Sequence, residues 1–269
     1  VARLLESAEP GDVLIQNLPD PGLTYYLRDQ IPRVLPPVSY PVDGEHTESE
    51  LRHISETYHR IWLQPQIHQK WDSEGLVEAW LDRHTLKVAE KRISGLRLSL
   101  YLPPQSLEDV RIPVQTVLGE QIQLSGYLLS VGSELQEREL GDPPPSLETP
   151  LLHPGETLQL ALFWQPLTEI QTDYTVFAHL YDRNDTLWAQ RDNPPVSGTY
   201  PTNQWKPGQT IIDSYEIQLP PELPTGEYRL AVGMYDWVTG DRLAVTGNPD
   251  RIMSDSRILL APVQIGGNP

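Results

Sequence analysis

The sequence contains no cysteine and no long apolar segment, and these two absences exclude several classes of structure. Without cysteine there is neither a disulfide framework nor a thiolate metal site. No stretch approaches the roughly 18 consecutive apolar residues that a membrane-spanning helix requires. A secretory signal peptide is also missing, and the chain begins at Val1 rather than at methionine. We therefore expect the chain to be one part of a longer protein.

Positive charge is scarce in this sequence. The 20 Lys and Arg residues stand against 37 Asp and Glu residues, which gives a formal net charge of −17. Because proteins bind nucleic acid mainly through Lys and Arg contacts to phosphate, this balance argues against a nucleic-acid partner. The same charge disfavours binding to a bare anionic membrane surface. At 269 residues the chain exceeds the usual size of one domain, so we expect two.

The first part of the chain alternates between helical and strand patterns. Apolar residues recur at helical spacing in 1–8, 23–30, 51–58 and 75–84, and strand patterns occur at 12–17, 60–63, 86–92 and 96–102. The helix at 51–58 follows a predicted capping box, in which Thr47 precedes Glu50 by three residues. Alternation of this kind predicts a three-layer, Rossmann-like α/β domain over residues 1–104. Pro103-Pro104 marks its expected end.

After Pro104 the helical periodicity disappears, and short alternating strands are separated by Pro, Gly and Asp. This pattern predicts an antiparallel β-sandwich, of immunoglobulin-like or jelly-roll type, over residues 105–269. Two segments, 176–190 and 230–245, share one pattern: a strand ending in Tyr-Asp, a polar turn and a return strand. We expect each to form a β-hairpin.

No pattern in the sequence identifies a catalytic, metal or cofactor site. The loop after the first strand lacks the G-x-G-x-x-G fingerprint, and Asn17 and Asp20 there fit a turn and a helix cap as well as a sugar or nucleotide site. The histidines lack the spacing of a zinc motif, and no G-x-S-x-G elbow is present. We therefore predict no catalytic residue, no metal ligand and no cofactor.

The loop between the two predicted hairpins, residues 194–208, suggests a carbohydrate site. We predict that the rings of Tyr200 and Trp205 stack on a sugar, and that Asp182, Asp192 and Asn203 bind its hydroxyl groups. Two alternatives remain open. Both rings could be buried and serve only to order the loop, and the Asp and Asn side chains could serve the turns.

Several motifs along the chain resemble one family of membrane enzymes. They lie at 17–21, 25–27, 58–62, 71–81 and 98–104 in the first part, and at 176–180, 194–202 and 226–230 in the second. The first group resembles the region after the last transmembrane helix in bacterial membrane glycosyltransferases that use polyprenyl-phosphate-linked sugars. Protein-mannosyltransferase-like and aminoarabinose-transferase-like enzymes form this branch. The second group resembles the β-sandwich often found at the C-terminus of such proteins.

The resemblance implies a non-catalytic, extracytoplasmic part of a membrane-embedded glycosyltransferase, at the cell surface or in the periplasm. Its partners would be a glycan acceptor or a lipid-linked sugar donor, and the transmembrane region of its own parent chain. The family's catalytic aspartate lies in a loop between transmembrane helices that this sequence does not contain, so no catalytic residue is carried over. The alternatives are a carbohydrate-binding or structural module of a secreted protein, and a hydrolase.

Overall fold

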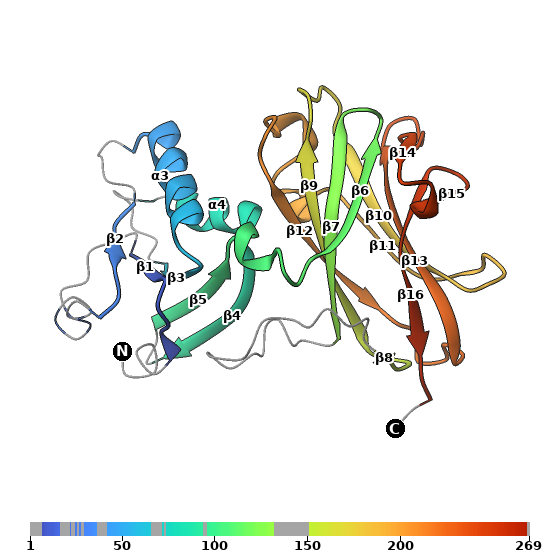
Figure 1. Ribbon diagram of the computed structural model, residues 1–269, viewed down its shortest axis with the longest axis horizontal. Helices are drawn as coiled ribbons and strands as arrows, with labels where there is room; N and C mark the ends of the chain where they lie inside the picture. The colour runs from blue at the N-terminus through green and yellow to red at the C-terminus, as the bar shows by residue number, and fades with distance from the viewer. Residues whose placement is uncertain are drawn as a thin grey trace. The chain divides into compact units, whose positions relative to one another are not determined.

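The computed structural model describes residues 7–16, 22, 25, 27, 30–36, 42–65, 72, 74–93, 96–131 and 151–267. Contacts divide these residues into two compact units (Figure 1). The first unit contains the described residues up to Asp109, and the second contains those from Val110 onward. Most of the predicted helices at 1–8 and 23–30, together with Asn17 and Asp20, lies outside the described residues.

The first unit is built on a five-stranded mixed sheet in the order β2-β1-β3-β5-β4. Strand β1 (Asp12–Gln16) runs parallel to β2 (Arg33–Val34) on one side and to the central strand β3 (Arg60–Gln64) on the other. Beyond β3, strand β5 (Leu96–Leu102) is antiparallel, and β4 (Leu86–Ile93) pairs antiparallel with β5 at the edge.

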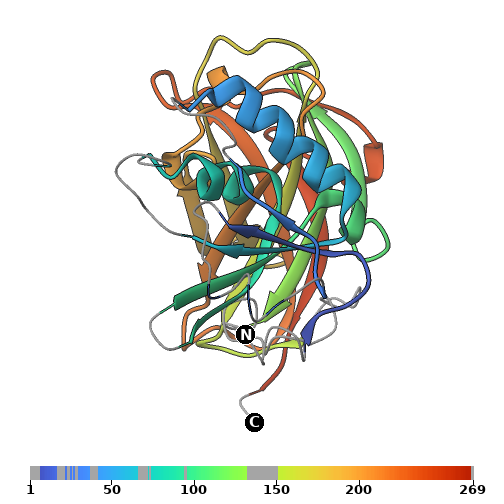
Figure 2. The ribbon, with the colours of Figure 1, turned by 90° about the vertical axis from the view of Figure 1, so that its left-hand side faces the viewer.

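Two α-helices, α3 (Gly44–Thr57) and α4 (Leu76–His84), lie on the same side of this sheet (Figure 2). Their apolar residues form one cluster with inward-facing residues of the strands: Val13, Ile15, Leu51, Ile54, Ile61, Leu63, Val77, Trp80, Leu81 and Tyr101. The predicted capping box is wrong, because α3 begins one turn earlier. Asp43 is the N-cap residue and accepts from the backbone N–H of His46, while the Thr47 hydroxyl donates to the Asp43 carbonyl.

The predicted three-layer, Rossmann-like domain is also wrong. The chain is mostly β, and the two fully described helices pack against a single face of the first sheet. A three-layer fold needs helices on both faces of a mainly parallel sheet. Here β4 and β5 are separated by only two residues, and so short a connection permits only antiparallel pairing.

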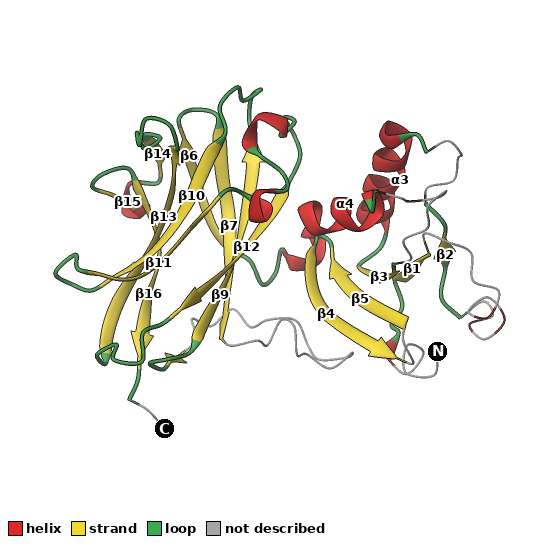
Figure 3. Ribbon diagram, turned by 180° about the vertical axis from the view of Figure 1, so that it is seen from behind, coloured by secondary structure: helices red, strands yellow, loops and turns green. Residues whose placement is uncertain are grey.

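The second unit contains two packed β-sheets (Figure 3). Its helical segments, among the described residues, are short 3-10 turns. One sheet has five strands in the order β12-β9-β7-β6-β14, all paired antiparallel. Its members are β6 (Ile112–Leu118), β7 (Ile122–Val131), β9 (Thr157–Pro166), β12 (Ile211–Gln218) and β14 (Val245–Gly247).

The other sheet has six strands in the order β11-β10-β13-β16-β15, with β8 added in parallel beside β16. Its members are β8 (Leu151–Leu152), β10 (Tyr174–Tyr181), β11 (Leu187–Asn193), β13 (Gly226–Asp236), β15 (Ile252–Met253) and β16 (Arg257–Ile265). The predicted hairpin at 176–190 is the β10–β11 pair. The second one forms differently, because its return segment makes only one bridge, Tyr235 to Arg242, and β14 then pairs with β6 of the opposite sheet.

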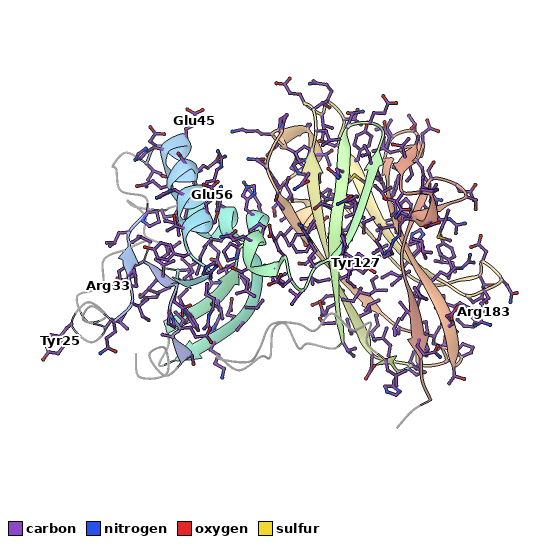
Figure 4. The ribbon with its side chains drawn as sticks, viewed as in Figure 1. Tyr25, Arg33, Glu45, Glu56, Tyr127 and Arg183 are labelled. Atoms are coloured by element: carbon purple, nitrogen blue, oxygen red, sulfur yellow. The ribbon has the colours of Figure 1, made fainter. Side chains whose placement is uncertain are left out.

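One hydrophobic core lies between the two sheets. Alternate residues of β10, namely Val176, Ala178 and Leu180, point into it. Tyr127 of β7 crosses this core, and its hydroxyl donates to the Leu260 carbonyl of the other sheet at 2.7 Å (Figure 4). A buried hydroxyl paired in this way joins the two sheets without leaving an unsatisfied polar group.

No helix among the described residues has the length and apolar character needed to cross a bilayer.

Candidate functional site

The two aromatic rings predicted to stack on sugar lie in the core of the second unit. Trp205 is 2% exposed and Tyr200 is 7% exposed, and both belong to the hydrophobic cluster between the sheets. The Trp205 indole donates to the Tyr200 carbonyl at 2.9 Å, and the Tyr200 hydroxyl donates to Gln209 at 3.0 Å. The stacking prediction is therefore corrected, since neither ring has a face open to a sugar. Both rings order the loop instead.

A buried acid anchors the start of the same loop. Asp213 of β12 accepts hydrogen bonds from the backbone N–H of Val196 at 2.8 Å and from the Tyr215 hydroxyl at 2.5 Å. The Trp164 indole approaches the same carboxyl at 3.4 Å. Burial raises the pKa of Asp213 to about 7, although these hydrogen bonds act in the opposite direction.

Asp182 serves the turn between β10 and β11. Its carboxylate accepts from the backbone N–H groups of Asn184 at 2.8 Å and Thr186 at 2.9 Å, and from the Trp188 indole at 3.2 Å. The hydrogen bond from Thr186 is the main cause of a lowered Asp182 pKa. The predicted sugar contact is replaced here by turn formation, which the sequence left open as the alternative.

Asn203 lies in the short 3-10 turn Thr202–Gln204, and its backbone N–H donates to Asp173 at 3.3 Å. Asp192 belongs to a different element, strand β11, and no hydrogen bond joins it to Asn203 among the described residues. Asp192 has a side chain that is 35% exposed and is hydrogen-bonded to His179 rather than to its own turn.

Asp192 belongs to the outer face of the six-stranded sheet, opposite the core. In register, Phe177 of β10 is aligned with Asp192 of β11 on one side and with Gly233 of β13 on the other. Alternation then places Phe177, His179 and Tyr181 on this outer side of the sheet, where all three are buried. Tyr235 of β13 is half-buried on the same side, and Asp192 is the exposed member of the group. We call these five residues, Phe177, His179, Tyr181, Asp192 and Tyr235, the β10 face.

A chain of hydrogen bonds fixes the Asp192 carboxylate. His179 Nε2 lies 2.7 Å from Asp192 Oδ1, and His179 Nδ1 lies 2.9 Å from the Tyr181 hydroxyl. Because a carboxylate only accepts, Nε2 carries the proton in this contact. Burial, together with the nearby negative charge of Asp192, raises the Tyr235 pKa. Asp192 is thus held by His179 and lies close to Tyr235.

Two arginines lie over aromatic rings of the β10 face. The Arg257 guanidinium lies 4.6 Å from the centre of the Tyr181 ring, and that of Arg242 lies 4.5 Å from the centre of the Phe177 ring. Arg257 also forms a two-pronged ion pair with Asp185, at 3.1 and 3.0 Å. The Asp185 hydrogen bond raises the Arg257 pKa, and the same contact lowers the Asp185 pKa.

The hydrogen bonds of His179 lie within the β10 face. A general base can hold a carboxylate on one nitrogen and the hydroxyl of a nucleophile on the other, but the hydroxyl here belongs to Tyr181, which is only 8% exposed. Both nitrogens of His179 are occupied, one by Asp192 and one by Tyr181. Nor do the described residues contain a group of three or more His, Asp or Glu side chains placed to hold a metal ion.

The sequence did not identify His179 or Tyr235 as site residues. His179 lies in the first of the two similar Tyr-Asp segments and Tyr235 in the second. The sequence shows both segments but not that their strands lie side by side. Period-two alternation along 174–181 places His179 on the face away from the apolar residues. Its meeting with Asp192 and Tyr235 depends on the register of three strands, which residue spacing does not encode.

No protein-family model matches the sequence, and a search of curated proteins also gives no match. Among solved structures, the C-terminal domain of wzt aligns with 61% of this chain and 86% of its own, at 10% identity and a TM-score of 0.36. A Niemann-Pick type C2 protein from Japanese carpenter ant aligns with 57% of this chain and 98% of its own, at 9% identity and a TM-score of 0.33.

A beta-glucuronidase 2 from Bacteroides uniformis aligns with 56% of this chain but only 15% of its own, at 15% identity and a TM-score of 0.30. TM-scores of this size do not establish a shared fold, and the functions of these proteins therefore do not transfer to this chain.

Replacing Trp205 by alanine is expected to destabilise the second unit. The substitution removes a buried indole and its hydrogen bond, which costs about 3–5 kcal/mol of unfolding free energy. Trp237→Ala is the matched control, because Trp237 is 73% exposed and its loss should change stability by about 0.5 kcal/mol or less. Urea denaturation followed by circular dichroism measures both. Equal stability of the two variants would contradict the buried position of Trp205.

Asp213 is expected to make stability depend on pH. Its folded-state pKa of about 7 exceeds its ordinary value of 3.8, so the folded protein binds this proton more tightly than the unfolded chain. The resulting stabilisation is complete below the ordinary value and is lost as the pH rises through about 7. Relative to Asp213→Asn, the wild type should lose stability between pH 4 and pH 7, by about 1.4 kcal/mol per unit of pKa difference. Parallel profiles in urea titrations across this range would show that Asp213 does not titrate in this way.

Proposed function

We propose that the second unit is a non-catalytic carbohydrate-binding module whose ligand lies on the β10 face. The observation that carries this proposal is the fixed, part-exposed carboxylate of Asp192. The 2.7 Å hydrogen bond from His179 orients it, so a ligand does not have to order it. A carboxylate has about four acceptor positions, and this donor leaves room for hydroxyl groups of a sugar.

An exposed ring stands at the end of the same strand. Trp237 follows β13 directly, two residues after Tyr235, and is 73% exposed. The turn that carries it is closed by the backbone N–H of Gly240 donating to the Asp236 carbonyl at 2.8 Å. A large ring held on a closed turn offers an apolar face at little entropic cost, which is what stacking on a sugar ring requires.

This module fits the role that the sequence resemblance implies. We propose that the whole chain is a non-catalytic, extracytoplasmic part of a membrane-embedded glycosyltransferase, and that the β10 face helps to hold a glycan acceptor or a lipid-linked donor. The resemblance supports this proposal. Sequencing the reading frame upstream of Val1 tests it. Several membrane spans there would support a membrane-bound parent, whereas a secretion signal alone would favour a secreted module.

Glycan binding by the chain is expected to depend on Asp192. Binding of the full chain to a glycan array should yield ligands with dissociation constants between millimolar and micromolar, a range of about −4 to −8 kcal/mol. Asp192→Asn keeps the shape but removes the charge, and should weaken binding by about tenfold or more in calorimetric titrations.

The matched control for this prediction is Asp250→Asn, which changes an exposed aspartate in the short turn Pro249–Arg251. It should bind like the wild type. Absence of any bound glycan, or equal binding by the two variants, would refute a carbohydrate site at Asp192. Turnover of chromogenic glycosides or esters that one Asp, Glu or Ser substitution abolishes would instead show a hydrolase.

A further inference from the structure

Arg242 lies at one side of the β10 face, beside β13, whereas Asp192 lies at the other side, on β11. Its backbone forms the single bridge to Tyr235, and its Nη1 donates to the Asp255 carbonyl at 3.0 Å. Its guanidinium lies over the Phe177 ring, 4.5 Å from the centre of the ring. A stacked guanidinium that is also tied by one hydrogen bond has a restricted orientation, with its remaining N–H groups available.

The Phe177 ring that supports Arg242 is itself held in place. It is buried, and it lies directly over the backbone of Gly233, where any Cβ atom would overlap the ring. The His179 ring flanks it at a centroid distance of 4.8 Å. Gly233 is therefore needed for close approach, and the ring provides a rigid base for the guanidinium.

The charge of Arg242 differs from that of its neighbours. Arg229 and Arg257, on the same side of the sheet, both pair with Asp185. Within the described part of the chain, Arg242 forms no ion pair with a carboxylate, and it is exposed. In a protein with a formal net charge of −17, an exposed and oriented guanidinium without an acidic partner is a local site for an anion.

We propose that the ligand of the β10 face is an acidic glycan, whose sugar carboxylate binds Arg242 while hydroxyl groups of the same glycan bind Asp192. This inference rests on the proposed carbohydrate-binding function and narrows its ligand class. Asp192 and Arg242 lie on opposite sides of the Phe177 and Tyr235 pair. The two opposite charges fix the direction of the ligand, because its carboxylate is attracted by Arg242 and repelled by Asp192.

Matched oligosaccharides test the charge requirement. The probes are uronate-containing fragments of hyaluronan, oligogalacturonate and alginate, each beside its carboxyl-reduced form, titrated calorimetrically into the full chain. The wild type should bind at least one acidic form about tenfold or more tightly than its reduced form. Raising the salt concentration should weaken this preference, because salt screens exposed charge pairs.

Variants then assign the preference to one residue. Arg242→Gln should abolish the preference and leave binding of the carboxyl-reduced form unchanged, while Arg242→Lys should retain part of it. Arg183→Gln is the matched control, because Arg183 is a 74% exposed arginine at the tip of the β10–β11 turn (Figure 4). It should keep the wild-type preference. Thermal melts of all variants establish that they fold.

The outcomes separate this inference from the proposed function. If no glycan binds, or if binding does not depend on Asp192, the carbohydrate-binding function itself fails. If glycans bind through Asp192 but the wild type shows no preference for the acidic form, only the acidic-ligand inference fails. It also fails if Arg242→Gln weakens acidic and reduced forms equally, since Arg242 would then contribute without recognising charge.

Discussion

Burial of both faces of β10 is the constraint on which the second unit depends. Its inner residues fill the core between the sheets, as they would in any sandwich. Its outer residues are covered as well, although they are Phe177, His179 and Tyr181 rather than a set of aliphatic side chains. A buried imidazole and a buried phenol must be hydrogen-bonded, or each costs about 1–3 kcal/mol. The ordering of Asp192, Tyr235 and Arg257 follows from this requirement.

One set of contacts satisfies buried groups and orients a partly exposed one. The hydrogen bonds of His179 also orient Asp192, so folding alone sets the position of this carboxylate. The loop at 194–208 differs, because its aromatic residues pack into the core between the sheets. There the aromatic residues turn inward, and Asp213 and Tyr215 satisfy the polar groups that come with them. Similar residue types therefore order a partly exposed carboxylate in one segment and a packed loop in the other.

The sequence was informative about local structure and much less so about assembly. Alternation and the polar turn located the β10–β11 hairpin, and the short link between 86–92 and 96–102 already contained the reason for their antiparallel pairing. Reading that region as a repeat of strand and helix led to the wrong three-layer domain. Asp192 was predicted only as a side chain that binds the hydroxyl groups of a sugar. The residues around Asp192 could not be predicted, because strand register rather than sequence spacing brings His179 and Tyr235 near it. Aromatic residues in a loop carry the same signal whether they face solvent or core, so Tyr200 and Trp205 could not be placed from sequence.

The turn that carries Trp237 has its two ends in different sheets. Tyr235 belongs to β13 of the six-stranded sheet, whereas Ala244 accepts from Gly119 and β14 continues along β6 of the five-stranded sheet. The turn therefore connects the two sheets at that end of the sandwich. Pulling it away would require the loss of backbone pairing in both sheets at once. The hydrogen-bonded amides at its two ends, those of Asp236 and Leu243, should therefore exchange with solvent only when both sheets open.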